Sequence, residues 1–220
     1  MFGGDPANPR RLRIKICGIT NAPDAEAAVQ AGADALGLNC FRGSKRYLDL
    51  ERAAEWVQAI PAHTGRVAVM VNPSLDEALA VARLPFISAL QLHGSESPEF
   101  CAQLAKERIR FAKAIPVTME TSLPHVFPYA TEWIVLDSAS ADSFGGTGQT
   151  FPWTVARRFI LAHPQHRVIL AGGLAPENVT RAVREVRPFG VDVTTGVESA
   201  PGQKDHARMR AFIEAARTAS

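Results

Sequence analysis

The stretch RIKICGITNAPDAEAAVQAGADALGLN, residues 13–39, decides the fold because it contains a complete strand–helix–strand unit. Residues 12–16 and 35–39 are short apolar runs with the length of strands, and residues 23–32 carry apolar side chains at helical spacing. Asn21 and Pro23 are typical of the start of a helix. Both strands are apolar without alternation, as in parallel strands that are buried on both faces. The stretch therefore predicts a βαβ unit.

The same pattern recurs along the whole chain. Six more apolar runs predict strands over residues 66–71, 87–92, 109–115, 133–136, 167–171 and 190–194. Helical spacing predicts helices over residues 50–60, 75–84, 98–108, 176–186 and 204–217, with start signals at Ser74, Ser97 and Ala175–Pro176. The fifth unit is the weakest, because Pro124 and Pro128 interrupt it. Eight units in about 200 residues predict a single (β/α)8 barrel, since doubly wound sheets usually have fewer strands.

Composition and charge narrow the class of protein. No linker divides the 220 residues, so we expect a loose extension over residues 1–11 and one catalytic domain over residues 12–220. A net charge of +2, with cations scattered among acids, argues against nucleic-acid binding, and no apolar run reaches the roughly 18 residues of a membrane span. The three cysteines form no CxxC pair, so neither a disulfide framework nor zinc is expected, and a cytoplasmic location fits best.

In such a barrel all strands point their carboxyl ends to one rim, where the loops that follow them build the active site. The sequence places Cys17 after the first strand and Asp137 at the end of the sixth. A thiol can act as a general base when a cation lowers its pKa, and a buried carboxyl can act as a general acid. Each residue also has a plain structural interpretation, an apolar filler for Cys17 and a loop cap for Asp137.

Three glycine-rich loops lie late in the chain, at residues 144–150, 171–179 and 194–202. Glycine lets backbone N–H groups turn towards an anion, and barrels often bind a phosphate with the loops after strands seven and eight. Taken alone, Gly172 and Gly173 are as consistent with a tight turn between strand and helix. The two last loops together favour a phosphate site.

Two more residues at the rim are candidates. Arg46, with Lys45 beside it, could bind a carboxylate, although a solvated surface arginine is the simpler interpretation. His93 ends the fourth strand and could be an acid or a ligand, but a hydrogen-bonded structural histidine is more common. No second histidine or carboxylate lies at a spacing that would complete a metal site.

Many ordered blocks of the sequence resemble the phosphoribosylanthranilate isomerase family of tryptophan biosynthesis. The blocks run from about residue 12 to the last helix: KICGIT (15–20), GADALGL (32–38), SKRY (44–47), VNPS (71–74), LQLHG (90–94), VLDS (135–138), GGTGQTFPW (145–153), AGGLAPENV (171–179) and VDVTTGVESAPGQKD (191–205). The specificity of the resemblance comes from the number and order of these blocks.

The resemblance implies a monomeric or homodimeric enzyme that converts N-(5-phosphoribosyl)anthranilate to 1-(2-carboxyphenylamino)-1-deoxyribulose 5-phosphate without metal or cofactor. It implies that Cys17 is the general base, Asp137 the general acid and Arg46 the ligand of the anthranilate carboxylate. The phosphate would be held by the backbone amides at Gly172, Gly173, Thr195 and Gly196.

Five positions depart from the family pattern. Cys40 and the pair Arg42–Gly43 stand where an aromatic residue and a proline-containing turn are usual, which affects the anthranilate side of the site. Gln149 replaces a usual lysine and Pro152 a usual aspartate, which affects closure of the loop after the sixth strand.

Two alternatives stay open. A related barrel enzyme, such as the aminoaldose isomerase of histidine biosynthesis or a pentose-phosphate epimerase, would also bind a phosphosugar. The histidine-pathway isomerase typically has aspartates at the positions held here by Cys17 and Ala114, which argues against it. A non-catalytic phosphate binder would keep the glycine loops without needing Cys17 or Asp137, and this chain has both.

Overall fold

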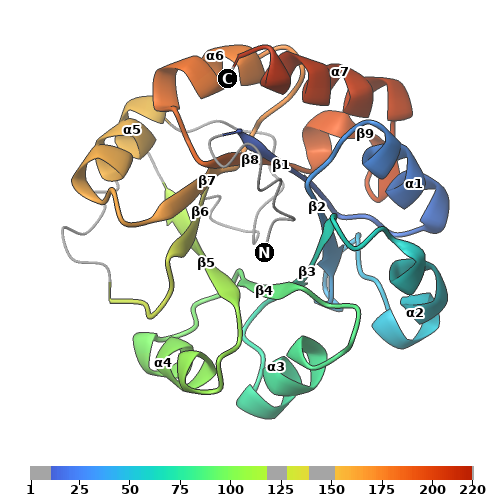
Figure 1. Cartoon of the computed structure of the whole chain (residues 1–220), viewed down its shortest axis with the longest axis vertical. Helices are drawn as coiled ribbons and strands as arrows, with labels where there is room; N and C mark the ends of the chain where they lie inside the picture. Colours follow the sequence, from blue (N-terminus) through green and yellow to red (C-terminus); the bar gives the residue numbers. More distant parts are fainter. Residues whose placement is uncertain (1–10, 118–127, 139–151, 220) are drawn as a thin grey trace.

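The computed structural model describes residues 11–117, 128–138 and 152–219. In these residues eight parallel strands close into a barrel in chain order, the last strand pairing with the first. Figure 1 shows the strands as an inner ring with the helices outside them. The predicted single (β/α)8 barrel is confirmed. No helix in the described part of the chain is long and apolar enough to cross a membrane.

Strands and helices alternate as the sequence predicts, and a helix that was not predicted lies over residues 153–162. The strands are β1 (Arg13–Cys17), β2 (Ala35–Asn39), β3 (Gly65–Met70), β4 (Ala89–Leu92), β5 (Phe111–Val117), β6 (Trp133–Ser138), β7 (Arg167–Leu170) and β8 (Gly190–Val193). The helices are α1 (Ala22–Gln30), α2 (Leu50–Ala59), α3 (Leu75–Ala82), α4 (Pro98–Lys106), α5 (Trp153–Ala162), α6 (Val179–Val186) and α7 (His206–Arg217). After β8 come a short 3-10 helix, η1 (Thr195–Val197), and an antiparallel hairpin of β9 (Glu198–Ala200) and β10 (Gln203–Lys204).

Three of the predicted helix starts are confirmed. The side chains of Asn21, Ser74 and Ser97 each accept a hydrogen bond from a backbone N–H in the first turn of α1, α3 and α4. These bonds satisfy amides that the helix itself leaves without a partner. The local sequence signals therefore place these three helices correctly.

The predicted start of α6 at Ala175–Pro176 is wrong, because the helix begins at Val179. The Asn178 side chain accepts a hydrogen bond from the Ala175 amide at 2.9 Å and donates one to the Gly173 carbonyl at 2.9 Å. These two bonds hold the residues before Val179 in turns, which delays the helix.

The inside of the barrel combines small apolar side chains with a buried ion pair. The apolar cluster consists of Ala35, Val67, Ala89, Ala112, Ala114, Val135, Ile169 and Ala171. Lys15 on β1 is paired in register with Asp192 on β8, and the Lys15 Nζ to Asp192 Oδ2 distance is 2.6 Å. Lys15 has no exposed surface. A larger cluster, which includes Ile14, Ile16, Leu36 and Leu38, packs the outer face of the strands against the helices.

Two predictions fall on residues outside the described ranges. The extension over residues 1–11 is described only at Arg11, so the division between the extension and the domain over residues 12–220 stays a prediction. The glycine-rich loop over residues 144–150, with Gln149, also lies outside the described residues.

Candidate active site

A pocket of about 510 Å³ opens at the carboxyl ends of the strands. Its lining includes residues from β1, β2, β4, β6 and β8 and from the loops that follow these strands. The predicted site residues among its lining are Cys17, Arg46, His93, Asp137, Gly172, Gly173 and Thr195. The structure thus brings together at one mouth residues that are far apart in the sequence.

Cys17 is the last residue of β1 and lies against β2. A Cβ atom added at Gly37 would be 2.5 Å from the Cys17 sulfur and 3.0 Å from its Cα, closer than real side chains approach. Residue 37 must therefore be glycine for the sulfur to occupy this position. Only 8 % of Cys17 is exposed, and that part faces the pocket.

Two lysines lie close to Cys17, and sequence reasoning named neither. Burial by itself lowers the pKa of Lys15, but attraction to Asp192 and to Cys17 outweighs burial and raises that pKa. Burial lowers the pKa of Lys204, against the opposing effects of Glu198 and Cys17. Lys204 donates to the Cys17 backbone carbonyl at 2.6 Å, which fixes the end of β1. Lys15 could have been predicted to lie near Cys17, because it precedes Cys17 by two residues and so lies on the same face of the strand.

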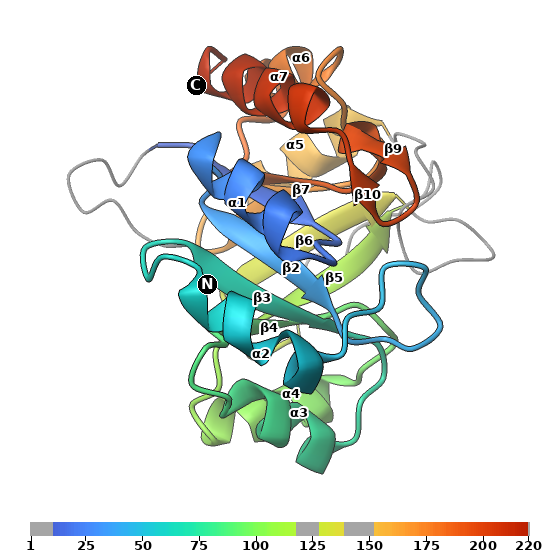
Figure 2. The ribbon, with the colours of Figure 1, turned by 90° about the vertical axis from the view of Figure 1, so that its right-hand side faces the viewer.

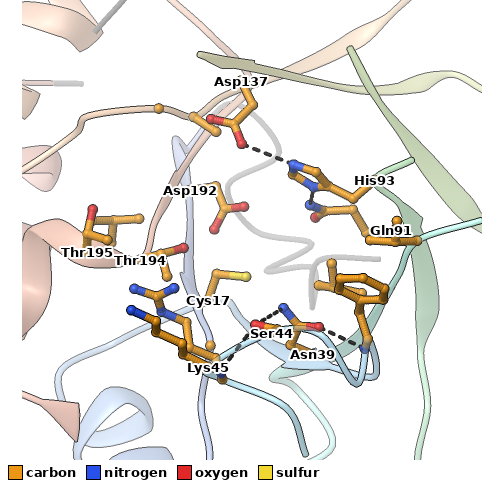
Figure 3. A pocket seen from close by; sticks show the side chains of 18 of the residues that line it. Cys17, Asn39, Ser44, Lys45, Gln91, His93, Asp137, Asp192, Thr194 and Thr195 are labelled. Atoms are coloured by element: carbon orange, nitrogen blue, oxygen red, sulfur yellow. Dashed lines mark hydrogen bonds and ion pairs between the residues drawn. The ribbon is translucent and has the colours of Figure 1, made fainter. Parts of the chain in front are cut away.

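Asp137 is buried at the end of β6 and is hydrogen-bonded to His93. The His93 Nε2 to Asp137 Oδ2 distance is 3.1 Å, and His93 Nδ1 lies 2.8 Å from the amide nitrogen of Gln91. Figure 3 shows this row of three side chains, with Asp137 across the pocket from Cys17. His93 is therefore hydrogen-bonded as the structural interpretation expected, but its partner is the candidate acid. Gln91, on β4, was missed, although it precedes His93 by only two residues.

Arg46 lines the pocket, but its guanidinium is already paired. It donates from Nε and Nη2 to the two carboxylate oxygens of Glu198 on β9, at 2.9 and 2.7 Å. The hydrogen bond with Glu198 is the main reason why the pKa of Arg46 is raised. Arg46 is thus not the solvated surface residue of the simpler interpretation, because only 15 % of its side chain is exposed.

The glycine loops after β7 and β8 pack against each other at the pocket. Gly172 and Gly173 have φ values of +83° and +63°, which glycine adopts without strain. A Cβ at Gly172 would lie 2.4 Å from the Ser138 nitrogen. Gly196 does not line the pocket; a Cβ there would lie 2.0 Å from the Leu174 carbonyl oxygen, so this glycine lets the two loops pack together.

Of the described positions that depart from the family pattern, Gly43 lines the pocket, whereas Cys40, Arg42 and Pro152 do not. Phe41, between Cys40 and Arg42, also lines it. Arg42 lies over the Tyr47 ring, 5.4 Å from its centroid. Pro152 is the N-cap of α5 and makes no side-chain capping hydrogen bond, so the usual aspartate's capping ability is lost here.

Asp192 has one carboxylate oxygen that is not used by the protein. Its Oδ2 pairs with Lys15, while Oδ1 is buried without a hydrogen-bond partner among the described residues. Asp192 lines the pocket, so Oδ1 can accept a hydrogen bond from a bound hydroxyl. In the described ranges no group of three or more His, Cys, Asp or Glu residues could hold a metal ion.

These features define a (β/α)8-barrel enzyme whose active site lies at the carboxyl ends of its strands. Residues 14–215 match the family model described as N-(5'phosphoribosyl)anthranilate (PRA) isomerase. The chain belongs to this family, and it is an isomerase of tryptophan biosynthesis.

Individual relatives agree with this assignment over nearly the whole chain. The N-(5'-phosphoribosyl)anthranilate isomerase of Trichlorobacter lovleyi is 41% identical over 208 residues, which are 94% of this chain and 99% of the relative. The crystal structure of phosphoribosyl anthranilate isomerase from Thermotoga maritima has 38% identity and a TM-score of 0.80, covering 94% of this chain and 99% of that one. A structure of the enzyme in complex with reduced 1-(o-carboxyphenylamino)-1-deoxyribulose 5-phosphate has 37% identity and a TM-score of 0.77, with the same coverage.

Proposed function

We propose that this enzyme catalyses the Amadori rearrangement of N-(5-phosphoribosyl)anthranilate, with Cys17 as the general base and Asp137 as the general acid. The observation that carries the proposal is that both side chains line one pocket, from β1 and from β6. The reaction needs an acid and a base on one sugar, so the two groups must face a common space. The complex of a relative with a reduced product analogue supports a pocket of this kind.

The chemistry assigns one proton to each residue. Asp137 gives a proton to the ring oxygen of the aminal sugar, the bond from C1 to that oxygen breaks, and a protonated imine forms at C1. Cys17 then removes the proton from C2, which the imine has made acidic, and an enaminol results. A proton moves from the C2 hydroxyl to C1 to give the ketone, so that the product is an isomer of the substrate.

Two lysines hold the end of β1 that carries Cys17. Lys15 lies below it on the same face of β1, and Lys204 holds its backbone carbonyl. Both lysines stay fixed because each pairs with a carboxylate, Lys15 with Asp192 at 2.6 Å and Lys204 with Glu198 at 2.9 Å.

Two anionic ends of the substrate would be held at separate places. The backbone at Gly172, Gly173 and Thr195 would bind the phosphate, and Gly196 would support that site through its contact with the loop after β7. Arg46 would bind the anthranilate carboxylate through Nη1, because Nε and Nη2 are paired with Glu198. Asp192 Oδ1 would accept a hydrogen bond from a sugar hydroxyl.

The test is turnover of the purified protein and of two separate variants, Cys17→Ser and Asp137→Asn, followed through the loss of substrate fluorescence. We expect each variant to lose at least about a hundredfold in kcat/KM, because each removes one proton-transfer group. Cys40→Ser and Asp76→Asn are the matched controls, since these residues lie outside the pocket lining. A wild-type protein without turnover would support the non-catalytic phosphate binder, and variants as active as the controls would show that the roles are wrong.

The oligomeric state, the location and the independence from a cofactor are also proposals. We expect a monomer or a homodimer in the cytoplasm that works without a cofactor and without nucleic acid. The three free thiols are consistent with a reducing compartment. Light scattering on the purified protein would measure the oligomeric state.

A further inference from the structure

Three pocket side chains form one hydrogen-bonded row that ends on the candidate acid. Gln91 lies on β4 and His93 just after it. Because the two residues are two positions apart, both side chains face the inside of the barrel. Asp137 reaches them from β6. Gln91 is 1 % exposed, and its Nε2 lies 2.8 Å from His93 Nδ1. His93 Nε2 lies 3.1 Å from Asp137 Oδ2 (Figure 3). The mechanism above uses only the last member of this row.

The amide of Gln91 determines which ring nitrogen of His93 carries the proton. An amide nitrogen donates, so His93 Nδ1 must accept from it, and the neutral ring then has its proton on Nε2. Nε2 then donates that proton to Asp137 Oδ2. This arrangement suits the row after the acid has given up its proton.

The other end of the same amide is without a partner. Gln91 Oε1 is buried and makes no hydrogen bond to any described residue. A buried acceptor without a donor costs free energy. If the amide turns over, Oε1 faces Nδ1 and can accept from it, but only when Nδ1 carries a proton. That condition is met when the row holds one more proton, either as His93 imidazolium with Asp137 carboxylate or as neutral His93 with Asp137 carboxylic acid.

The geometry points to a proton that His93 and Asp137 share before the sugar ring opens. Gln91 is the positioning residue: its amide nitrogen faces Nδ1 when the pair lacks this proton, and its amide oxygen faces Nδ1 when the pair holds it. This inference rests on the proposed function. The pair gives its extra proton to the ring oxygen and keeps one proton on His93 Nε2. Cys17 takes a proton from C2 in the same turnover. Over one turnover the His93–Asp137 pair therefore loses one proton and Cys17 gains one. Exchange with water restores both groups.

Other charged groups near the row occur as ion pairs. Lys113 on β5 donates to the carbonyls of Leu92 and Gly94, on either side of His93, and pairs with Glu96 at 2.8 Å. Across the pocket, Lys15 on β1 pairs with Asp192 on β8. Each pair has no net charge, so neither decides by itself whether His93 is protonated. Cys17 also faces this space.

The test reads the protons of His93 directly, by nitrogen-15 NMR of the histidine rings in the wild-type protein and in Gln91 variants. At alkaline pH we expect neutral wild-type His93 to carry its proton on Nε2. The Gln91→Met variant removes the donor to Nδ1, and its neutral His93 should become a mixture of the two forms. The Gln91→Glu variant places a carboxylate beside Nδ1, which favours the imidazolium, so its titration should move up by about one pH unit or more.

Activity gives the second readout. The alkaline limb of kcat/KM against pH should move upwards in Gln91→Glu in parallel with the NMR titration, whereas Gln103→Glu, an exposed position on α4, should match the wild type. A wild-type His93 with its neutral proton on Nδ1, or a Gln91→Glu variant that titrates as the wild type does, would overturn the inference. If Gln91→Glu does not fold, the spectra of the wild type and of Gln91→Met still show which ring nitrogen of His93 carries the proton, and so test the inference. A wild-type protein that shows the expected spectra but no turnover would count against the proposed function and not against the proton arrangement.

Discussion

The Cys17 sulfur lies against the backbone of β2, and this contact restricts residue 37 to glycine. We predict that Gly37→Ala lowers kcat/KM by about a hundredfold, because a methyl group 2.5 Å from the sulfur must displace it from the substrate. The contrast is Gly32→Ala: its Cβ would meet nothing within 4 Å, but its φ of +95° disfavours alanine. Gly32→Ala should cost stability, by about 1 kcal/mol, without loss of activity in the folded protein. Steady-state kinetics with thermal unfolding distinguish the two, and full activity of Gly37→Ala would contradict the assigned position of the sulfur.

The two thiols outside the pocket should be slow to react. Burial raises the pKa of Cys40 to about 12 and that of Cys101 to about 11. A raised pKa keeps a thiol protonated, and the protonated form is a poor nucleophile. We predict that at pH 8 iodoacetamide modifies both residues much more slowly in the native protein than in the denatured protein, measured by peptide mass spectrometry. Equal rates in the two states would show that these thiols are not shielded.

The location of a residue was predictable where it follows from the end of a strand. The ion-pair partner of a residue was not predictable where that partner lies far away in the sequence. Cys17 and Asp137 end strands, so the barrel rule alone places them at one rim. The partner of Arg46 could not be predicted, because Glu198 lies 152 residues away and reaches Arg46 from a hairpin that no local pattern signalled. The same holds for Lys15 and Asp192, which are 177 residues apart and meet because the last strand pairs with the first.

At the scale of elements, the N-cap of α7 stabilises a helix that packs where the last strand of the barrel meets the first. Asp205 accepts hydrogen bonds from the amides of Ala207 and Arg208 at 2.9 and 3.0 Å, and the helix that follows packs against α1, α6 and β1. We predict that Asp205→Ala lowers the free energy of unfolding by about 1 kcal/mol, whereas Asp205→Asn keeps most of it. Urea unfolding measures both. An alanine variant as stable as the wild type would mean that the cap contributes nothing.

The strands were easier to predict than the helices. All eight apolar runs became strands because burial on both faces leaves a continuous apolar signal. No helix was predicted over residues 153–162, where α5 lies, because Pro152 gives no capping signal there and the stretch is rich in β-branched and aromatic residues. The start of α6 was missed because the bonds of the Asn178 side chain compete with helix formation.

At the scale of the whole molecule, the β9–β10 hairpin connects the loops around the mouth. Glu198 accepts from Arg46 in the loop after β2 and from Lys204, and Lys204 also reaches the carbonyls of Cys17 and Thr194. Figure 2 shows this hairpin at the same end of the barrel as the loop after β2. The hairpin therefore orders the base, the arginine and the loop after β8 as one unit.

The acid stability of the protein should depend on Glu198. Burial alone would raise the pKa of Glu198, but hydrogen bonds and charges from Arg46 and Lys204 outweigh burial and lower it. A carboxyl with a lowered pKa stabilises the fold above its unfolded pKa of about 4.3, and this contribution is lost as the pH falls through the folded pKa. We predict that Glu198→Gln has a lower Tm than the wild type at pH 7 and that the difference shrinks below about pH 4. Glu26→Gln, exposed on α1, is the control, and a difference independent of pH would contradict this account.

The central claim is that a sulfur from β1 and a carboxyl from β6 act on one substrate whose phosphate lies on the loops after β7 and β8. A crystal structure of this protein with reduced 1-(o-carboxyphenylamino)-1-deoxyribulose 5-phosphate tests it most directly. The account predicts the phosphate within hydrogen-bond distance of the amides of Gly173 or Thr195, with the sugar carbons between Cys17 and Asp137. A phosphate bound elsewhere, or a sugar that leaves either side chain without contact, would contradict it.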